Sequence, residues 1–169
     1  MTTNPTAQAD PTRAFRLDGR VILVTGASRG LGRGFAETLA QAGATVALAA
    51  RSQDALAEVQ AGIEGAGGKA FCVQLDVTDK TQVEAAVATI VDQAGRIDGL
   101  INNSGIAVTR RLLDVSEDDW NSVLTTNLTG AWFVAQAAAR QMVAQFKADG
   151  SGGAIVNISS LLGIRTNPG

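Results

Sequence analysis

Apolar residues along the chain form two alternating patterns, short continuous runs and longer helical stripes. The runs, at 21–24, 44–49, 70–75, 99–102 and 154–158, are typical of strands buried on both faces of a parallel sheet. The segments between them repeat apolar residues every three or four positions, beginning with Leu31, Phe35, Leu39 and Ala42, and predict helices. This alternation predicts an α/β fold with a doubly wound parallel sheet between two helical layers, truncated after the fifth strand.

Capping residues mark where the expected helices begin. Ser52, Asp79 with Gln82, and Ser116 with Asp119 each precede an apolar stripe, as residues at a helix N-terminus do. The last signature predicts the longest helix, which reaches to about Phe146. Its expected inward stripe is Trp120, Val123, Leu124, Asn127, Leu128, Ala131 and Val134.

The first fourteen residues differ from the rest of the chain. Residues 1–14 hold two prolines and small polar residues, so we expect a disordered leader. This leader lacks the apolar core of a signal peptide. Residues 15–169 are expected to form one dinucleotide-binding domain that is incomplete at its C-terminus.

Composition excludes several classes of function. A net charge of −2 without any basic run argues against a nucleic-acid partner, and no apolar run is long enough to span a membrane. Histidine is absent, which excludes Ser-His hydrolases and His-based zinc sites. Cys72 is the single cysteine, so neither a thiolate metal cluster nor a disulfide framework can form. We therefore expect no metal site and a cytoplasmic location.

A glycine-rich turn follows the first apolar run. Gly26, Gly30 and Gly32 separate the strand at 21–24 from the first helical stripe. A helix that starts beside glycines offers unpaired N–H groups and a positive dipole end to an anion such as a pyrophosphate. The spacing is wider than G-x-G-x-x-G, and no Gly-Lys-Ser/Thr of a P-loop follows. The turn by itself is therefore either a nucleotide cradle or a plain connector.

Other special residues follow the remaining strands. Because the carboxyl ends of parallel strands meet at one edge of a sheet, ligands of such folds bind there. The residues expected at this edge are Gly26 to Gly32, Arg51, Asp76, Asn102 to Gly105, and Ser159 with Ser160.

The motifs, and their order along the chain, resemble those of the short-chain dehydrogenase/reductase family. The residues that carry the resemblance are Thr25 to Gly32, Asp76-Val77, Asn102 to Gly105, Asn127, and Ile155 to Ser160. It covers about residues 15–169 and implies a Rossmann sheet that binds NAD(H) or NADP(H). It also implies hydride transfer between the nicotinamide and a carbonyl or alcohol substrate of the ketone or 3-oxoacyl type.

The resemblance also implies which residues hold the cofactor: Gly26, Ser28, Arg29, Gly30, Leu31, Gly32, Arg51, Asp76, Val77, Asn103, Ser104 and Gly105. Asp76 would lie against the adenine, and Ser104 replaces the alanine of the family's Asn-Asn-Ala-Gly. The second strand ends at Arg51 without an acid, which favours the 2′-phosphate of NADP over NAD. Arg29 offers a second guanidinium. Alternatively, both arginines are simply solvated.

Two residues match the family's catalytic positions. Ser160 would help to hold the substrate's carbonyl oxygen, although serines also end strands because they make turns. Asn127 falls on the apolar stripe, so its amide is expected to be buried and hydrogen-bonded. It would either belong to a proton relay or only fasten the long helix to the sheet. The loop Ile106–Leu112 and residues 161–164 would line the substrate pocket, and Arg110 and Arg111 would meet an acidic group or solvent.

The catalytic Tyr-x-x-x-Lys segment of the family is absent. The chain contains no tyrosine, so we expect the N-terminal part of a longer enzyme, inactive alone, with an exposed apolar edge at its fifth strand. We expect a dimer or tetramer in the full-length protein. A noncatalytic NADP-binding or regulatory module is the alternative, and a structural partner using the helix from Ser116 to Phe146 is a third. The substrate and the direction of reaction stay open.

Overall fold

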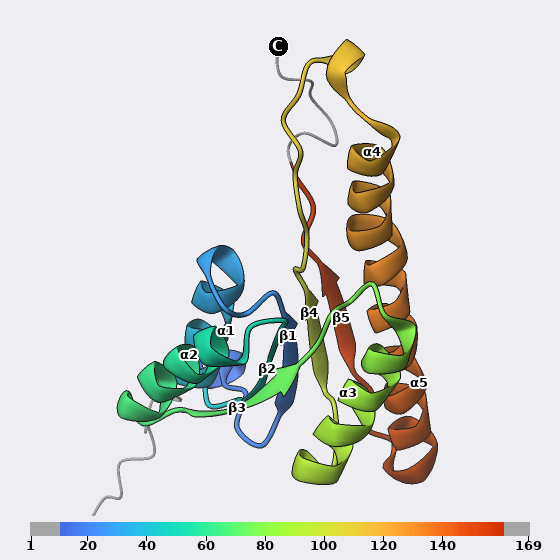
Figure 1. Ribbon diagram of the computed structural model, residues 1–169. Coiled ribbons are helices and arrows are strands. Elements are labelled where there is room, and N and C mark those ends of the chain that lie inside the picture. Colours follow the sequence, from blue (N-terminus) through green and yellow to red (C-terminus); the bar gives the residue numbers. More distant parts are fainter. Residues whose placement is uncertain (1–10, 161–169) are drawn as a thin grey trace, which may run out of the picture.

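The five apolar runs pair as parallel strands of one sheet, in the order β3-β2-β1-β4-β5. The computed structural model describes residues 11–160 (Figure 1). The strands are β1 (Val21–Thr25), β2 (Thr45–Ala50), β3 (Lys69–Gln74), β4 (Gly99–Asn102) and β5 (Ala154–Asn157). The chain reverses its direction of travel across the sheet after β3, so β1 and β4 become neighbours. The predicted doubly wound sheet is confirmed.

Helices cover both faces of this sheet (Figure 1). One layer consists of α1 (Gly30–Gln41) and α2 (Gln53–Gly65), and the other of α3 (Lys80–Ala94) and α5 (Ala131–Asp149). Each layer has its own core. Val24 and Leu48 pack with the first layer, whereas Leu23 and Leu100, register partners in β1 and β4, pack with the second. The three-layer architecture is confirmed.

The predicted N-terminal caps are present. The side chain of Ser52 accepts a hydrogen bond from the Ala55 amide, and Asp79 accepts from the amides of Thr81 and Gln82. Ser116 and Asp119 form a reciprocal capping box. These short polar patterns fix their helices locally, so the sequence is enough to locate them.

The longest helix differs from the prediction. It consists of α4 (Glu117–Leu124), a π-helical turn η3 (Thr125–Gly130) and α5, and α4 projects beyond the C-terminal ends of the strands (Figure 1). Only the α5 part of the expected stripe is buried, as at Val134, whereas Trp120 is 61% and Leu128 65% exposed. The prediction of a buried stripe was wrong for α4 and η3, because the sheet does not extend far enough to cover them.

Two smaller observations concern the N-terminal end of the described chain and α1. Pro11–Phe15 forms a 3-10 turn at the junction between the expected leader and the domain. In α1 the small residues Gly32, Ala36 and Ala40 form the buried face, so Leu31 is exposed although the stripe placed it inside. Small residues occupy the buried face because they let the helix approach the sheet closely.

β5 is the edge strand, as expected. Val156 is 47% exposed, and a hollow of about 540 Å³ lies between this strand, β4 and the segment around Leu17. On this side of the sheet, none of the described helices covers β5 (Figure 1).

Candidate functional site

The glycine-rich turn lies between the end of β1 and the start of α1. Gly26 and Gly30 adopt positive φ angles of 65° and 58°, which a residue with a Cβ rarely does. Arg29 occupies the N-cap position in an extended conformation, and no side chain caps the helix. The first N–H groups of α1 are therefore available to an anion, with the positive end of the helix dipole behind them.

Close contacts explain the third glycine. A Cβ on Gly32 would overlap the carbonyl oxygen of Gly26 and stand 2.6 Å from Nδ2 of Asn103. A Cβ on Gly26 would itself lie 3.0 Å from the same nitrogen. The turn thus folds tightly against the segment that follows β4, and this geometry has room only for glycine at position 32.

Thr25 joins the ends of β1 and β4. Its hydroxyl oxygen accepts hydrogen bonds from the backbone amides of Asn103 and Ser104, both at 2.9 Å, and Asn103 donates to the Thr25 carbonyl at 3.0 Å. Thr25 is completely buried. It was not among the expected cofactor residues, although its position directly before the first glycine was a possible signal. The hydroxyl holds the two loops together at the point where the strand order reverses.

The end of β2 carries the expected positive charge. Arg51 follows Ala50 directly and is exposed, as is Arg29 across the neighbouring turn. Neither arginine forms an ion pair within the described residues, 11–160. The Arg51 carbonyl accepts a hydrogen bond from Gln74 at 3.2 Å, which ties this corner to β3. Both guanidiniums are thus free to bind a phosphate.

The turn after β3 is also well ordered. One carboxylate oxygen of Asp76 accepts from the amide and hydroxyl of Thr78, and the Asp76 amide donates to the Gln82 side chain at 3.0 Å. Within residues 11–160 the second carboxylate oxygen of Asp76 accepts no hydrogen bond, and Val77 is 5% exposed. The segment therefore offers one acceptor and a buried hydrophobic support at the C-terminal edge.

The side chain of Asn127 is exposed, which corrects the expected burial. It lies on the π-helical turn, above the part of the helix that the sheet covers. Its amide nevertheless forms two hydrogen bonds of 2.8 Å with the backbone N–H and C=O of Ile106. Asn127 thus fastens the helix to the loop after β4, where a Cβ on Gly105 would lie 3.4 Å from its Oδ1.

Ser160 is the last described residue and is exposed. The amide of Ile158 donates to the Asn102 carbonyl at 3.0 Å, so pairing with β4 continues past β5 and directs the serines to the same edge. Arg110 pairs with Asp119 at 2.7 Å, and Arg111 is exposed in the loop before α4. The expected pocket residues 161–164 lie outside the described residues.

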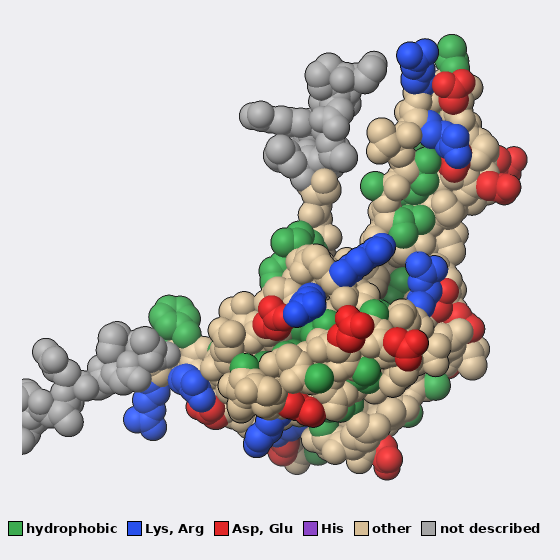
Figure 2. Space-filling model, turned by 60° about the vertical axis from the view of Figure 1, so that its left-hand side comes forward, with side chains coloured by type: hydrophobic (Ala, Val, Ile, Leu, Met, Phe, Trp, Pro, Cys, Tyr) green, Lys and Arg blue, Asp and Glu red, His purple; other side chains and the backbone are tan. Residues whose placement is uncertain are grey.

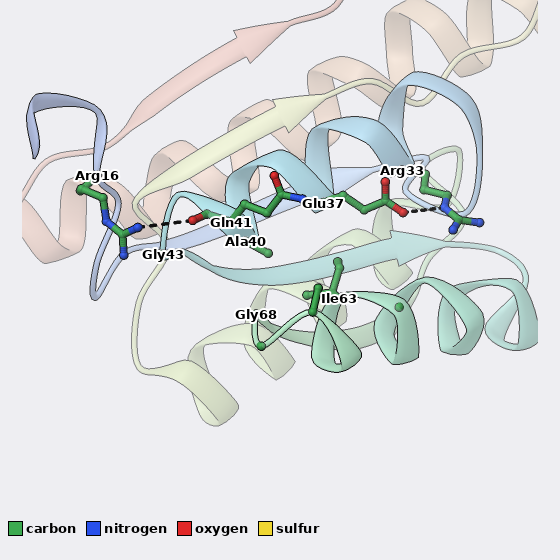
Figure 3. A pocket seen from close by; sticks show the side chains of 11 residues that line it. Arg16, Arg33, Glu37, Ala40, Gln41, Gly43, Ile63 and Gly68 are labelled. Atoms are coloured by element: carbon green, nitrogen blue, oxygen red, sulfur yellow. Dashed lines mark hydrogen bonds and ion pairs between the residues drawn. The ribbon is translucent and has the colours of Figure 1, made fainter. Parts of the chain in front are cut away.

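A separate hollow of about 460 Å³ runs between α1 and α2 toward Gly43 (Figure 3). Its two arginines already have acidic partners, Arg16 with Asp18 and Arg33 with Glu37. The glycine-rich edge, in contrast, keeps its cationic groups available.

A family match covers most of the chain. The sequence matches the family model described as short chain dehydrogenase over residues 20–169. The chain belongs to the short-chain dehydrogenase family. The fold agrees: a short-chain dehydrogenase/reductase from Mycobacterium marinum superposes with a TM-score of 0.90 at 39% identity, covering 95% of this chain and 64% of that one.

Two curated relatives of the short-chain dehydrogenase family show its range. The 3-oxoacyl-acyl-carrier-protein reductase FabG of Thermotoga maritima is 40% identical over 92% of this chain and 61% of its own length. Gluconate 5-dehydrogenase of Gluconobacter oxydans is 42% identical over 92% of this chain and 59% of its own. The chain thus spans about 60% of the length of these relatives. None of the helices in residues 11–160 has the length and apolar character to cross a membrane.

Proposed function

We propose that this chain is the cofactor-binding part of an NADP(H)-dependent oxidoreductase that acts on a ketone or 3-oxoacyl substrate. The observation that carries the proposal is the combination of an uncapped α1 N-terminus with two unpaired arginines, Arg29 and Arg51, at the same edge. An acidic residue at the end of β2 would instead suit the ribose hydroxyls of NAD. Arginine forks suit a 2′-phosphate.

The residues present fit the cofactor. Gly30 faces open space, with nothing within 4 Å of a Cβ placed on it, and the N–H groups from Gly30 to Gly32 would bind the pyrophosphate together with Ser28. Asp76 and Val77 would hold the adenine, while the Asn103–Gly105 loop would pass beside the nicotinamide ribose. When bound, NADP(H) supplies the hydride that is exchanged with the substrate carbon.

The catalytic roles of Ser160 and Asn127 are part of the same proposal. A serine hydroxyl at the end of β5 can donate a hydrogen bond to a carbonyl oxygen and stabilise its developing charge. Asn127 directs both of its amide groups to Ile106. Its side chain therefore positions the loop after β4, and any part in proton transfer would fall to its backbone and bound water.

The 169 residues contain no tyrosine and so lack the phenol that the family uses as proton donor. We therefore propose that this chain alone binds nucleotide but does not turn over. A noncatalytic NADP-binding module is the second candidate, favoured by the same absence. Steady oxidation of NADPH with a 3-oxoacyl substrate, by a sample whose intact mass equals this chain, would refute both the inactivity of the chain alone and the noncatalytic module.

Assembly and location complete the proposal. Leu128, Trp132, Val143 and Phe146 are each more than half exposed along the η3–α5 helix. Separately, hydrophobic side chains are also visible on the projecting part of the molecule (Figure 2). Such a stripe supports a homo-oligomer, a dimer or a tetramer. The free thiol of Cys72 agrees with a reducing cytoplasm.

Titration of the chain with NADPH and with NADH tests the cofactor. We expect one NADPH per chain, bound at least about tenfold more tightly than NADH, because a charge-assisted bidentate contact contributes about 1.5–3 kcal/mol. Equal affinities would contradict the NADP preference, and binding of neither nucleotide would contradict the cofactor assignment itself.

A further inference from the structure

Gly130 lies in close contact with the turn that follows β3. It is the last residue of the π-helical turn and is buried. A Cβ placed on it would stand 2.9 Å from both Cγ2 and the carbonyl oxygen of Val77. The helix therefore rests directly on the backbone of the turn after β3.

The backbone of Gly130 does not itself need glycine. Its φ of −63° is ordinary helical geometry, which alanine adopts readily and with better helix propensity by about 1 kcal/mol. The conformation thus gives no reason for glycine here. What excludes a side chain is the distance to Val77.

Neighbouring contacts fix the same short piece of helix to other loops of the site. Ala131, the next residue, accepts a hydrogen bond at its carbonyl from Asn102 at 2.8 Å, and Asn102 also donates to Asn157 of β5 at 3.1 Å. Three positions before Gly130, Asn127 binds Ile106. A π-helical turn is wider than an α-helical one, so residues three apart are separated further around the axis.

We propose that Gly130 is a positioning residue that sets the distance between the helix and the turn holding Asp76 and Val77. Through the helix it also sets the position of Asn127 and hence of the loop at Ile106. The adenine end of the cofactor site and the loop after β4 are then coupled through one glycine. The part of this inference that concerns adenine rests on the proposed function, whereas the coupling between the two loops does not.

Gly130→Ala tests the proposal, with Gly62→Ala as the matched control. Gly62 lies inside α2, and a Cβ there meets nothing within 4 Å. Affinity for adenosine 2′,5′-bisphosphate, a probe of the adenine half, should fall at least about tenfold in Gly130→Ala because an inserted methyl shifts the packed turn. In Gly62→Ala it should stay within about twofold. If the unsubstituted chain binds this probe, equal affinity in the two variants would overturn the proposal.

Hydrogen exchange in the absence of nucleotide separates this inference from the proposed function. In Gly130→Ala the Ile106 amide, which binds Asn127, should exchange at least about fivefold faster than in Gly62→Ala. An unchanged rate overturns the coupling. If the unsubstituted chain binds no nucleotide but the Ile106 rate responds, the cofactor assignment fails and the positioning role stands.

Val77→Ala approaches the same contact from the other side, in case Gly130→Ala does not fold. Removing the two methyl groups of Val77 opens a gap against Gly130 without inserting an atom. The backbone of Ile106 is bound by Asn127 and not by Val77, so faster exchange of the Ile106 amide in Val77→Ala would support transmission through the helix. An exchange rate equal to that of the unsubstituted chain would overturn it.

Discussion

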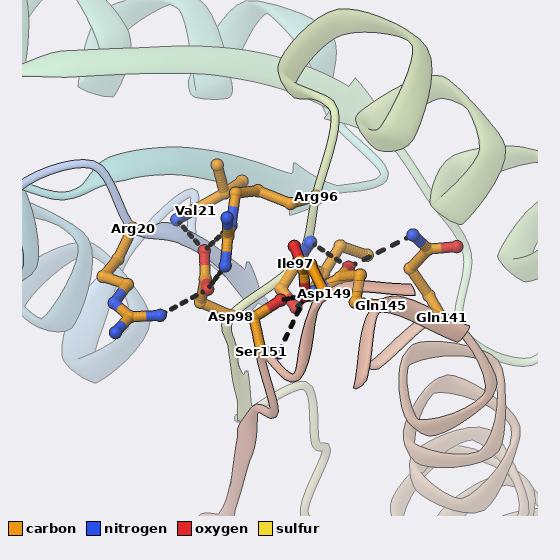
Figure 4. Close-up of polar contacts among 9 residues, drawn as sticks. All are labelled: Arg20, Val21, Arg96, Ile97, Asp98, Gln141, Gln145, Asp149 and Ser151. Atoms are coloured by element: carbon orange, nitrogen blue, oxygen red, sulfur yellow. Dashed lines mark hydrogen bonds and ion pairs between the residues drawn. The ribbon is translucent and has the colours of Figure 1, made fainter. Parts of the chain in front are cut away.

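At the N-terminal edge of the sheet, Asp98 is enclosed by cationic partners, whereas at the C-terminal edge Arg29 and Arg51 have no acidic partner within residues 11–160. Asp98 accepts hydrogen bonds from Arg20, from Arg96 and from the amide of Val21, at 2.6–2.9 Å (Figure 4). Its side chain is 3% exposed. The charge of Asp98 is therefore balanced by Arg20 and Arg96 within the fold.

Gln145 reinforces the same edge. It accepts from the Ile97 amide at 2.8 Å and donates to the Ile97 carbonyl at 3.0 Å, which fastens α5 to the start of β4 (Figure 4). Asn127 uses the same two-bond arrangement on a loop backbone, but at the open edge. Gln145 and Asn127 show that the same type of side chain, with the same bonding arrangement, occurs at the structural edge and at the candidate site. The difference is whether the polar groups find their partners inside the chain.

The largest effect is expected from Asp98→Ala. The change leaves the buried Val21 amide without its acceptor and two guanidiniums without their counter-charge. The free energy of unfolding should therefore fall by about 3 kcal/mol. Urea unfolding measures this. Asp92→Ala, at an exposed position of α3, is the control and should stay within about 0.5 kcal/mol. Equal stabilities of the two variants would show that the N-terminal edge does not stabilise the fold as described.

Gly32→Ala should have the next largest effect, at the opposite edge. The added methyl collides with the Gly26 carbonyl and Asn103, so NADPH affinity should fall at least about tenfold, and stability by about 2 kcal/mol. Gly34→Ala, in the same helix with nothing within 4 Å of its Cβ, is the matched control. Isothermal titration should separate the two variants, and identical affinities would remove the glycine turn from the site.

Arg51→Ala should affect binding and leave stability nearly unchanged. Loss of its guanidinium should weaken NADPH about tenfold without changing NADH, because only NADPH carries the 2′-phosphate. Stability should stay within about 0.5 kcal/mol, since the side chain is exposed. Parallel titrations with the two nucleotides measure this. An equal loss of affinity for both would assign Arg51 to the pyrophosphate or to general electrostatics.

The smallest expected effect is a pH dependence of the folding stability, which arises from Asp98 at the N-terminal edge. Burial raises the pKa of Asp98, but hydrogen bonds from Arg96, the Val21 amide and Arg20 outweigh it and hold the pKa below the usual range of an aspartate. The ionised group therefore stabilises the fold above the unfolded-state pKa, and this contribution is lost as the pH falls through the folded-state pKa. The stability difference between the unsubstituted chain and Asp98→Asn should shrink below about pH 4 in urea titrations. A constant difference down to pH 2 would contradict this linkage.

Local patterns in the sequence were enough for much of this structure. Buried parallel strands leave continuous apolar runs, and caps such as Ser116 with Asp119 act within one turn of helix. The glycine turn could be predicted because positive φ angles and close contacts leave glycine as the simplest residue there. These features depend on neighbours in the sequence.

Features that depend on distant contacts were missed or misplaced. The stripe through Trp120 and Leu128 has a helical period, but whether it is buried depends on how far the sheet extends. Thr25 and Gly130 owe their importance to loops that are remote in sequence, at Asn103 and Val77. The exposure of Asn127 follows from the same overhang of the helix.

The central claim is that a dinucleotide binds across the C-terminal edge, over the turn between β1 and α1. The most direct test follows backbone amide signals of the ¹⁵N-labelled chain while NADPH is added. The account predicts the largest shifts at Gly26–Gly32, near Arg51 and at Asp76–Thr78, with little change around Asp98 and Ile97. Shifts confined to the N-terminal edge or to the hollow between α1 and α2, or no shifts at saturating NADPH, would contradict it.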